Sequence, residues 1–456
     1  MLAAALFALA APVDSAPQPV QVAIEREGDQ FVAEFDFPDR ARAWGFFRSS
    51  LAAADGASWR GQSWKVLTPG VRLERRGRWD ALVASDGGAV PDRVRVRVAP
   101  FTGEVQSDYV PALKLGGASV ALFDGHFATF SVDGPDRLDT LPTNFDTATV
   151  GDFGTRVAFE GDDAFRLAGD VAGYREGRSA GTYGLFGVPT ATVTNGVATV
   201  IDSELPGWIA GYIADFTPKV IESLQQGLGP SGTAEPTILA AWEGAERDGA
   251  SMNGGSLKGL VLMRLEGRKA LTALPALRDM VRWFIAHETA HFWLGQAVAY
   301  ETAADSWIME GGADLLAVRT VAKLDPAFDP NRRLNEALAD CVRLAEKPIS
   351  SAHDRGDFKV HYACGAVFGL VAEQARGGDF LAFNKGLIDA NREDGYLSRA
   401  EWLAELDRAS GKPILSRAIA TLLDDGAVDP RTAVSSLLRE GGITYRLDSN
   451  GVPQLP

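Results

Sequence analysis

The sequence predicts an α+β protein of more than one domain, with a β-rich N-terminal part followed by a mainly helical part. Its 456 residues are enough for about two to four domains, and 46% hydrophobic residues can fill sizeable cores. Before about residue 215, apolar and polar residues alternate in several segments, which is typical of half-buried strands. From about residue 274 to residue 440, apolar residues recur mostly at helical spacing.

The charge balance excludes one large class of partner. The formal net charge is −15 and the sequence pI is about 4.9. A chain this acidic repels phosphate backbones, so we expect no nucleic-acid binding. No stretch after the N-terminus reaches the roughly 18 apolar residues of a membrane span, so we expect no stable span either.

The first residues, "MLAAALFALAAPVDSAPQ", resemble a secretory signal. Positions 2–11 are apolar, and Asp14, Ser15 and Ala16 offer a small-residue cleavage site. We therefore predict a signal peptide over residues 1–16 and export of the protein to the periplasm or the medium. The alternative is a disordered apolar terminus.

Residues 17–215 are predicted to form a β-rich N-terminal domain. "FVAEFDF" places Phe31, Ala33, Phe35 and Phe37 on one face, and "RVRVRVA" alternates in the same way. "SVALFDGHFATFSV" is interpreted as two strands joined by a two-residue turn at Asp124-Gly125. His126 would then be a solvent-exposed hairpin residue.

Residues 216–440 are predicted to form a second domain, followed by a C-terminal tail over residues 441–456. The second domain begins with a predicted helix over about 216–227 and a strand in "TILAAWEG". A Gly-rich "SMNGGS" and an apolar "LVLM" come next, before the helices. Cys341 and Cys364 either pair in the oxidising environment of an exported protein or stay as two buried thiols.

A helix predicted over about 275–297 carries the sequence "HETAH" at its end. Its apolar stripe is formed by Leu277, Val281, Phe284 and Ile285. His287 and His291 are one turn apart, so both imidazoles can reach one ion, and neutral imidazole suits zinc. Glu288 lies beside the pair and can reach a water molecule at the metal.

A catalytic zinc site needs a third protein ligand and one open position. Glu310, in "DSWIMEGGADLLA", follows His291 after 18 intervening residues, enough for one helix to end and a second to begin beside it. Asp314 lies one turn after Glu310 and can accept a hydrogen bond from a ligand histidine. The alternative interpretation is a helix with two hydrogen-bonded, partly buried histidines.

These motifs resemble those of the aminopeptidase N family of gluzincins, which includes leukotriene-A hydrolase. "HETAHFWLG" is similar to the family's HExxHxWxG, and "WIMEGGADLLA" is similar to its WLNEGFAxY at the family spacing. The resemblance implies a thermolysin-like catalytic domain with a helical lobe. It also implies that His287, His291 and Glu310 bind zinc and that Glu288 is the general base.

A tyrosine motif extends the resemblance. "HYACGAVFGLVAEQ" places Tyr362 52 residues after Glu310, where the family has the tyrosine of YxKGA, and Cys364 stands in place of the lysine. A phenol at this place can donate to the oxyanion of a tetrahedral intermediate. The alternative is a tyrosine that only packs its ring, and His361 beside it is expected to be a surface or packing residue.

The sequence departs from the family upstream of the histidines. Aligning "NGGSLKGLVLMR" with the family's G-x-M-E-N strand places Ser256 where the family has the glutamate that binds the substrate's free amine. Lys258 nearby would repel an ammonium group. We therefore assign Ser256 and Lys258 to the substrate-binding region and expect peptidase chemistry without the family's dependence on a free amine.

The sequence therefore predicts a zinc-dependent metallopeptidase whose partner is a peptide substrate. The metal would activate a water molecule and polarise the scissile carbonyl, with Glu288 as general base and Tyr362 as oxyanion donor. Two alternatives stay open: a zinc-binding protein of the same fold with a degenerate site, or a hydrolase of non-peptide substrates. The sequence makes no prediction of the oligomeric state.

Overall fold

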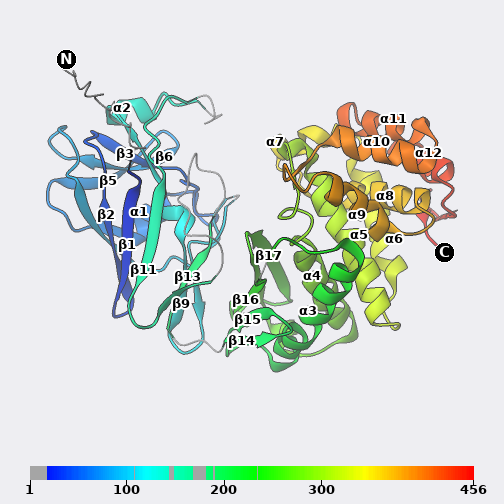
Figure 1. The fold of residues 1–456 in the computed structure, drawn as a ribbon, viewed down its shortest axis with the longest axis horizontal. Helices are drawn as coiled ribbons and strands as arrows, with labels where there is room; N and C mark the ends of the chain where they lie inside the picture. The colour runs from blue at the N-terminus through cyan, green and yellow to red at the C-terminus, as the bar shows by residue number, and fades with distance from the viewer. Residues whose placement is uncertain (1–17, 107, 143–147, 168–180, 188–190, 234) are drawn as a thin grey trace, which may run out of the picture. The chain divides into compact units, whose positions relative to one another are not determined.

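The computed structural model describes residues 18–106, 108–142, 148–167, 181–187, 191–233 and 235–456 (Figure 1). The predicted signal peptide lies outside these residues. The chain divides into two compact units, of which the first comprises residues 1–113, 122–165 and 170–186, and the second residues 114–121, 166–169 and 187–456. The α+β class and the N-terminal β domain are confirmed.

Three sheets are built from the strands of the first 186 residues. Their strand orders are β11-β1-β2-β7-β4, β10-β3-β6-β5 and β12-β13-β9-β8. The strands are β1 (Val20–Glu27), β2 (Gln30–Asp36), β3 (Ala43–Phe46), β4 (Trp64–Val66), β5 (Val71–Arg76), β6 (Trp79–Ala84), β7 (Arg93–Val98), β8 (Ala112–Leu115), β9 (Ser119–Phe123), β10 (Thr129–Val132), β11 (Thr155–Glu160), β12 (Ala164–Arg166) and β13 (Tyr183–Phe186). Two short helices, α1 (Trp59–Ser63) and α2 (Pro135–Leu138), interrupt them.

The alternating patterns are confirmed, and the predicted hairpin is wrong. Phe31, Ala33 and Phe35 of β2 are fully buried, as are the valines of β7 that pair with them. Asp124 and Gly125 instead begin a short 3₁₀ turn, and β9 and β10, on its two sides, belong to different sheets. The Asp124 carboxylate accepts a hydrogen bond from the Thr182 backbone amide at 2.7 Å, so a buried tertiary contact outweighs the local turn preference.

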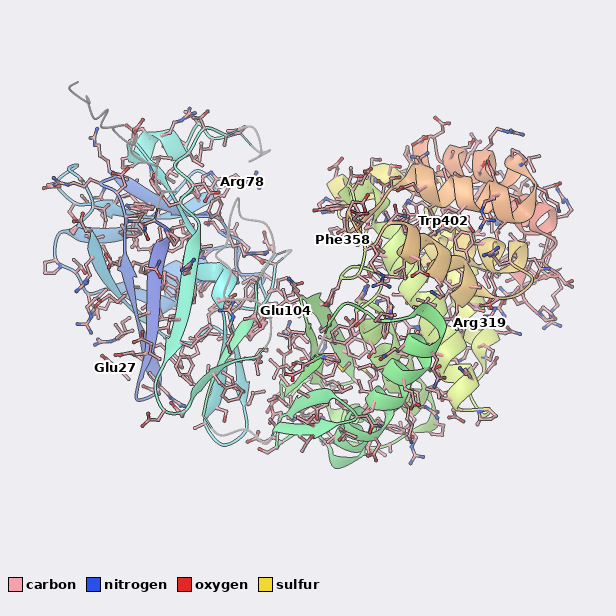
Figure 2. The ribbon with its side chains drawn as sticks, viewed as in Figure 1. Glu27, Arg78, Glu104, Arg319, Phe358 and Trp402 are labelled. Carbon is pink, nitrogen blue, oxygen red and sulfur yellow. A yellow bond between two sulfur atoms is a disulfide. The ribbon has the colours of Figure 1, made fainter. Side chains whose placement is uncertain are left out.

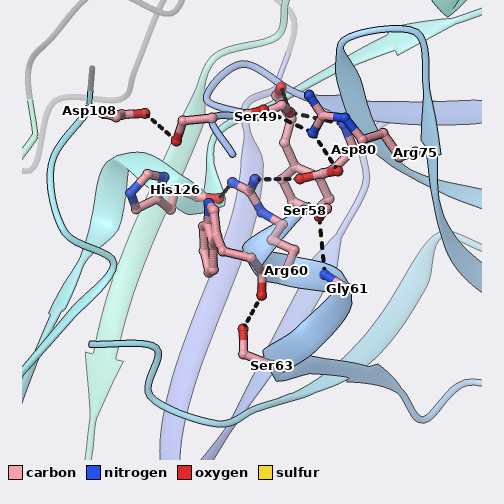
Figure 3. Close-up of polar contacts among 12 residues, drawn as sticks. Ser49, Ser58, Arg60, Gly61, Ser63, Arg75, Asp80, Asp108 and His126 are labelled. Atoms are coloured by element: carbon pink, nitrogen blue, oxygen red, sulfur yellow. Dashed lines mark hydrogen bonds and ion pairs between the residues drawn. The ribbon is translucent and has the colours of Figure 1, made fainter. Parts of the chain in front are cut away.

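His126 is buried rather than solvent-exposed, and its Nε2 lies 2.9 Å from the Tyr109 carbonyl oxygen. Its own carbonyl accepts a hydrogen bond from Arg60, a fully buried arginine (Figure 3). Arg60 is paired with Asp80, and its guanidinium lies 4.4 Å from the ring centroid of Phe46. Burial lowers the pKa of Arg60 to about 10, although Asp80 opposes this shift. The Asp80 carboxylate, the His126 carbonyl and the ring of Phe46 therefore stabilise this charge inside the β core.

The second unit begins with a five-stranded sheet in the order β14-β15-β16-β18-β17. Its strands are β14 (Ala191–Thr194), β15 (Val197–Ile201), β16 (Thr237–Trp242), β17 (Ser251–Leu257) and β18 (Leu260–Glu266). The middle strands β15, β16 and β18 are parallel, and β17 pairs antiparallel to β18 at the edge. Parallel strands covered by helices are expected to be rich in apolar residues, as "TILAAW" and "LVLMRL" are.

Helices α3 (Gly207–Leu228) and α4 (Pro275–Ala290) pack against this sheet. α3 begins nine residues before its predicted start, at Gly207, directly after Pro206. All four residues of the predicted α4 stripe are buried. α4 ends earlier than predicted, with His291 as its C-terminal cap, and the chain then turns through Gly295 at a φ of 122°.

The remaining helices form a lobe that packs around α5 and α8 (Figure 1). They are α5 (Ser306–Leu324), α6 (Pro330–Leu344), α7 (Ala352–Arg355), α8 (Lys359–Ala375), α9 (Phe380–Ala390), α10 (Arg399–Ser410), α11 (Pro413–Asp424) and α12 (Pro430–Gly441). Short strands β19 (Ala299–Tyr300) with β20 (Tyr396–Leu397), and β21 (Arg446–Leu447) with β22 (Pro453–Gln454), complete the unit. No helix in the described residues has the length and apolar content to span a bilayer.

Trp402 of α10 holds part of the lobe together (Figure 2). Its ring meets that of Trp307 on α5 edge-on, with centroids 4.9 Å apart.

Cys341 of α6 and Cys364 of α8 form a disulfide bond, which decides between the two alternatives left open by the sequence.

Two glycines let α5 and α8 cross at backbone contact. A Cβ atom on Gly365 would lie 2.3 Å from the Trp307 carbonyl oxygen, and one on Gly311 would lie 2.2 Å from the Cα atom of Gly365. Real Cβ atoms do not approach backbone this closely, so only glycine permits the crossing. Gly311 follows Glu310, and Gly365 lies three residues after Tyr362, so the crossing sets the relative position of these two side chains.

We predict that Gly365→Ala destabilises the protein by about 1–3 kcal/mol, because a methyl group there forces two helix backbones apart. Equilibrium unfolding in denaturant measures the change. Gly386→Ala on α9, where a Cβ would meet nothing within 4 Å, is the matched control and is expected to be neutral or slightly stabilising. Equal stability of wild type and Gly365→Ala would contradict the crossing as described.

Candidate metal centre

Three side chains from two helices meet in the second unit. His287 and His291 come from the last turn and the cap of α4, and Glu310 comes from the second turn of α5. The Glu310 carboxylate oxygen Oε2 lies 3.6 Å from His287 Nε2 and 3.5 Å from His291 Nε2, and the two Nε2 atoms are 3.2 Å apart. Among the described residues, this is the group whose ligand atoms could hold a metal ion.

Each histidine is oriented through its other ring nitrogen. His287 Nδ1 lies 2.8 Å from a carboxylate oxygen of Asp314, and His291 Nδ1 lies 2.9 Å from the Leu294 carbonyl oxygen. Both partners only accept hydrogen bonds, so each Nδ1 carries the proton and donates it. Each neutral imidazole therefore presents the bare lone pair of Nε2 to the centre of the group.

This donor set fits a tetrahedral metal ion. Ligand atoms held at 2.0–2.1 Å from such an ion are about 3.3 Å apart, close to the three separations observed here. Without a cation or a proton between them, two nitrogen lone pairs would face each other at 3.2 Å. Glu310 Oε2 is buried and has no hydrogen-bond partner among the described residues, as expected for an atom whose partner is an ion.

The protonation equilibria show how strongly this group attracts positive charge. Burial lowers the pKa of His287, but Asp314 and Glu310 outweigh burial and hold it well above its usual value. Burial raises the pKa of Glu310, but His291 and His287 outweigh it and hold the pKa far below its usual range. A cation at the centre would replace the protons that the histidines otherwise take up.

Glu288 lies beside the group without being one of its members. Its side chain is buried, and burial raises its pKa, although His287 and His291 oppose that shift. A carboxylate with a raised pKa is a better proton acceptor at neutral pH than an exposed one. This environment suits a general base.

Tyr362, from the first turn of α8, lies against the same group. Its ring stacks on that of His287 with centroids 5.7 Å apart. Burial raises its pKa, and the carboxylates of Glu310 and Glu288 raise it further. The phenol therefore keeps its proton and can act as a hydrogen-bond donor. His361 beside it is buried, with its pKa lowered to about 4 mainly by burial, and is a packing residue.

The two predicted substrate-binding residues lie on the edge hairpin of the sheet. Ser256 of β17 pairs with Val261 of β18, on the sheet face that packs against α4. Lys258 lies in the turn between the two strands and is exposed. Glu266, the last residue of β18, is paired with Arg247 at 2.5 Å.

A cavity of about 300 Å³ adjoins the metal group. Asp314 and Tyr362 line it, together with Trp283 of α4 and residues of α6 and α8. Its walls are mainly apolar, with Val318 and Leu334 among them. The sequence analysis did not identify Trp283, which lies one turn before His287. It could not identify the Leu294 carbonyl, because any residue type provides a backbone carbonyl.

Comparison with known proteins supports the fold. No protein-family model and no curated protein matches the sequence. The M1 zinc metallopeptidase from Deinococcus radiodurans is similar over 90% of this chain and 94% of its own, at 14% identity and a TM-score of 0.49. A mutant of that enzyme bound to a Tyr-Ser-Ala substrate gives the same coverage at 13% identity and a TM-score of 0.50. The chain thus has the fold of the M1, or aminopeptidase N-like, metallopeptidases, and the predicted resemblance is confirmed for the fold.

We predict that Glu310→Ala loses tightly bound metal, because two imidazoles alone are a poor site compared with two plus a carboxylate. Metal analysis of protein equilibrated with zinc measures the loss, with about one ion per chain expected in the wild type. Glu301→Ala, which removes an exposed glutamate outside the group, is the control and should keep the ion. A full complement of tightly held metal in Glu310→Ala would rule out the ligand assignment.

Proposed function

We propose that this chain is a zinc-dependent metallopeptidase. The strongest support is the arrangement of three ligand atoms: the Nε2 atoms of His287 and His291 are 3.2 Å apart, and the Glu310 carboxylate lies beside both. Imidazole and carboxylate ligands in this number leave one position open, as catalytic zinc sites do. The similar fold of a metallopeptidase that binds the peptide Tyr-Ser-Ala supports a peptide as the substrate.

Four groups would divide the chemistry between them. A zinc ion held by His287, His291 and Glu310 would act as a Lewis acid that polarises the scissile carbonyl and makes water more acidic. Glu288 takes a proton from the attacking water and later gives it to the leaving amine. Tyr362 donates a hydrogen bond to the oxyanion that forms on the carbonyl. Asp314 keeps His287 in the tautomer whose Nε2 faces the centre.

Substrate selection is proposed to differ from that of a typical aminopeptidase. A carboxylate that binds the substrate ammonium contributes a charge-assisted hydrogen bond of about 1.5–3 kcal/mol. Ser256 offers only a neutral group at the corresponding position. Glu243 and Glu266, the acids at the ends of β16 and β18, are each paired with an arginine, Arg264 and Arg247. We therefore expect the free amine to matter little.

Export from the cytoplasm is part of the proposal. The apolar N-terminal segment first suggested it, and the Cys341–Cys364 disulfide bond supports it, because such bonds persist in oxidising compartments. The periplasm or the medium would then be the place where the enzyme meets its peptides.

The proposed activity is tested by Glu288→Ala. We expect this variant to keep about one zinc per chain and to hydrolyse peptides at least ~100-fold more slowly, the scale of a lost general base. Metal analysis and kcat for one cleaved peptide measure the two effects together. Peptide hydrolysis at the wild-type rate in Glu288→Ala would show that another group takes the proton.

We further expect N-acetylated peptides to be cleaved with a kcat/KM within about tenfold of that for the matched free peptides, since no charge-assisted bond to the amine is lost. Ser256→Glu is the comparison variant and should gain a preference for the free amine. A hundredfold preference for the free amine in the wild type would instead reveal an acidic anchor elsewhere.

A further inference from the structure

The carboxylate of Glu288 lies directly over a glycine of the edge strand. A Cβ atom built on Gly254 of β17 would be 2.3 Å from both Cδ and Oε1 of Glu288 and 2.8 Å from Oε2. All three separations are far below the distance at which carbon and oxygen atoms meet without overlap. The space that a side chain at position 254 would fill is therefore already filled by the carboxylate.

The backbone conformation does not explain this glycine. Gly254 lies inside a regular antiparallel pair, opposite Met263 of β18, and its φ is not positive. An alanine could adopt that strand conformation without strain. The three atoms that a methyl group would meet first here all belong to the Glu288 side chain.

Moving either backbone would disturb more contacts than moving one side chain. β17 is paired with β18 along its whole length, from Ser251 to Leu257. β18 and α4 share one core, in which Met263 and Leu265 of the strand and Phe284 and Ile285 of the helix are buried together. Pushing strand and helix apart would open that core, whereas rotating one glutamate costs far less. A methyl group at position 254 would therefore move the carboxylate.

The position of the Glu288 carboxylate matters for its proposed role as general base. Its neighbours on α4 are the two histidines, and it is buried beside them. A displacement of about 1 Å of a reacting group is enough to cost on the order of 100-fold in rate. The three atoms nearest to the added Cβ all belong to Glu288 and none to a metal-binding side chain, so we expect the metal site to be retained.

We infer that Gly254 is a positioning residue, whose missing side chain fixes where the Glu288 carboxylate stands beside the metal centre. This inference rests on the proposed role of Glu288 as general base. It goes beyond that role because it assigns a functional requirement to a residue of the edge strand that carries no chemical group of its own.

The test combines a structure with kinetics. In a crystal structure of metal-free Gly254→Ala, we expect the Glu288 carboxylate to have left its place over residue 254, with His287, His291 and Glu310 unmoved. Zinc content should stay at one ion per chain, and kcat should fall about 10–100-fold with little change in KM. Gly255→Ala, the same change on the opposite face of the strand, is the control and should alter kcat less than about threefold.

A shorter acid provides the rescue. Glu288→Asp withdraws the carboxylate toward α4 by one methylene, so Gly254→Ala should cost less than about threefold in that background. Such non-additivity is the sign of two residues that act on one position. Equal losses from Gly254→Ala in both backgrounds, equal losses from Gly254→Ala and Gly255→Ala, or an unmoved carboxylate in the crystal would each overturn the inference.

The outcome for Gly254 is separable from the outcome for the proposed function. If the wild type cleaves no peptide, the proposed function fails, while the metal-free crystal structure still tests whether residue 254 places the carboxylate. If the wild type cleaves peptides and Gly254→Ala does so equally well, the proposed function stands and the inference about Gly254 fails.

Discussion

The crossing of α5 and α8 at backbone contact is the constraint on which the candidate site depends. Gly311 and Gly365 remove the side chains that would keep the two helices at the usual distance of 8–10 Å. Glu310 and Tyr362, which lie next to these glycines on their helices, are thereby brought to the same group of charges. The disulfide bond between Cys364 and Cys341 ties α8 to α6 on the other side. The geometry of the metal centre thus depends on helix packing at residues that do not themselves bind the metal.

The same principle applies on the side of α4, where glycine again permits a close approach. Gly254 lets the edge strand lie against the Glu288 carboxylate, as Gly311 lets α8 lie against α5. Between these two approaches, the histidines are held by hydrogen bonds through their Nδ1 atoms, one to a side chain and one to a backbone carbonyl. Protein contacts thus orient both histidines and the Glu288 carboxylate, and electrostatic catalysis depends on groups that are held in place in this way.

Sequence alone predicted the fold class, the strands with strict alternation and the residues that could bind a metal. Helical spacing places His287 and His291 on one face, and no tertiary knowledge is needed for that step. The prediction from sequence was wrong at Asp124-Gly125, where a buried hydrogen bond to Thr182 outweighs a strong local preference for a hairpin turn. It also could not find the Leu294 carbonyl or the function of Gly254, because a backbone atom and a missing side chain leave no chemical signature in a sequence.

Digestion of a peptide library by the zinc-loaded protein, with products identified by mass spectrometry, tests the central claim most directly. We expect new peptide termini that are absent when a chelator is present, including products cut from N-blocked peptides. Zinc bound at His287, His291 and Glu310 without any cleaved peptide would contradict it, and would leave a metal-binding protein that only shares the fold of a metallopeptidase.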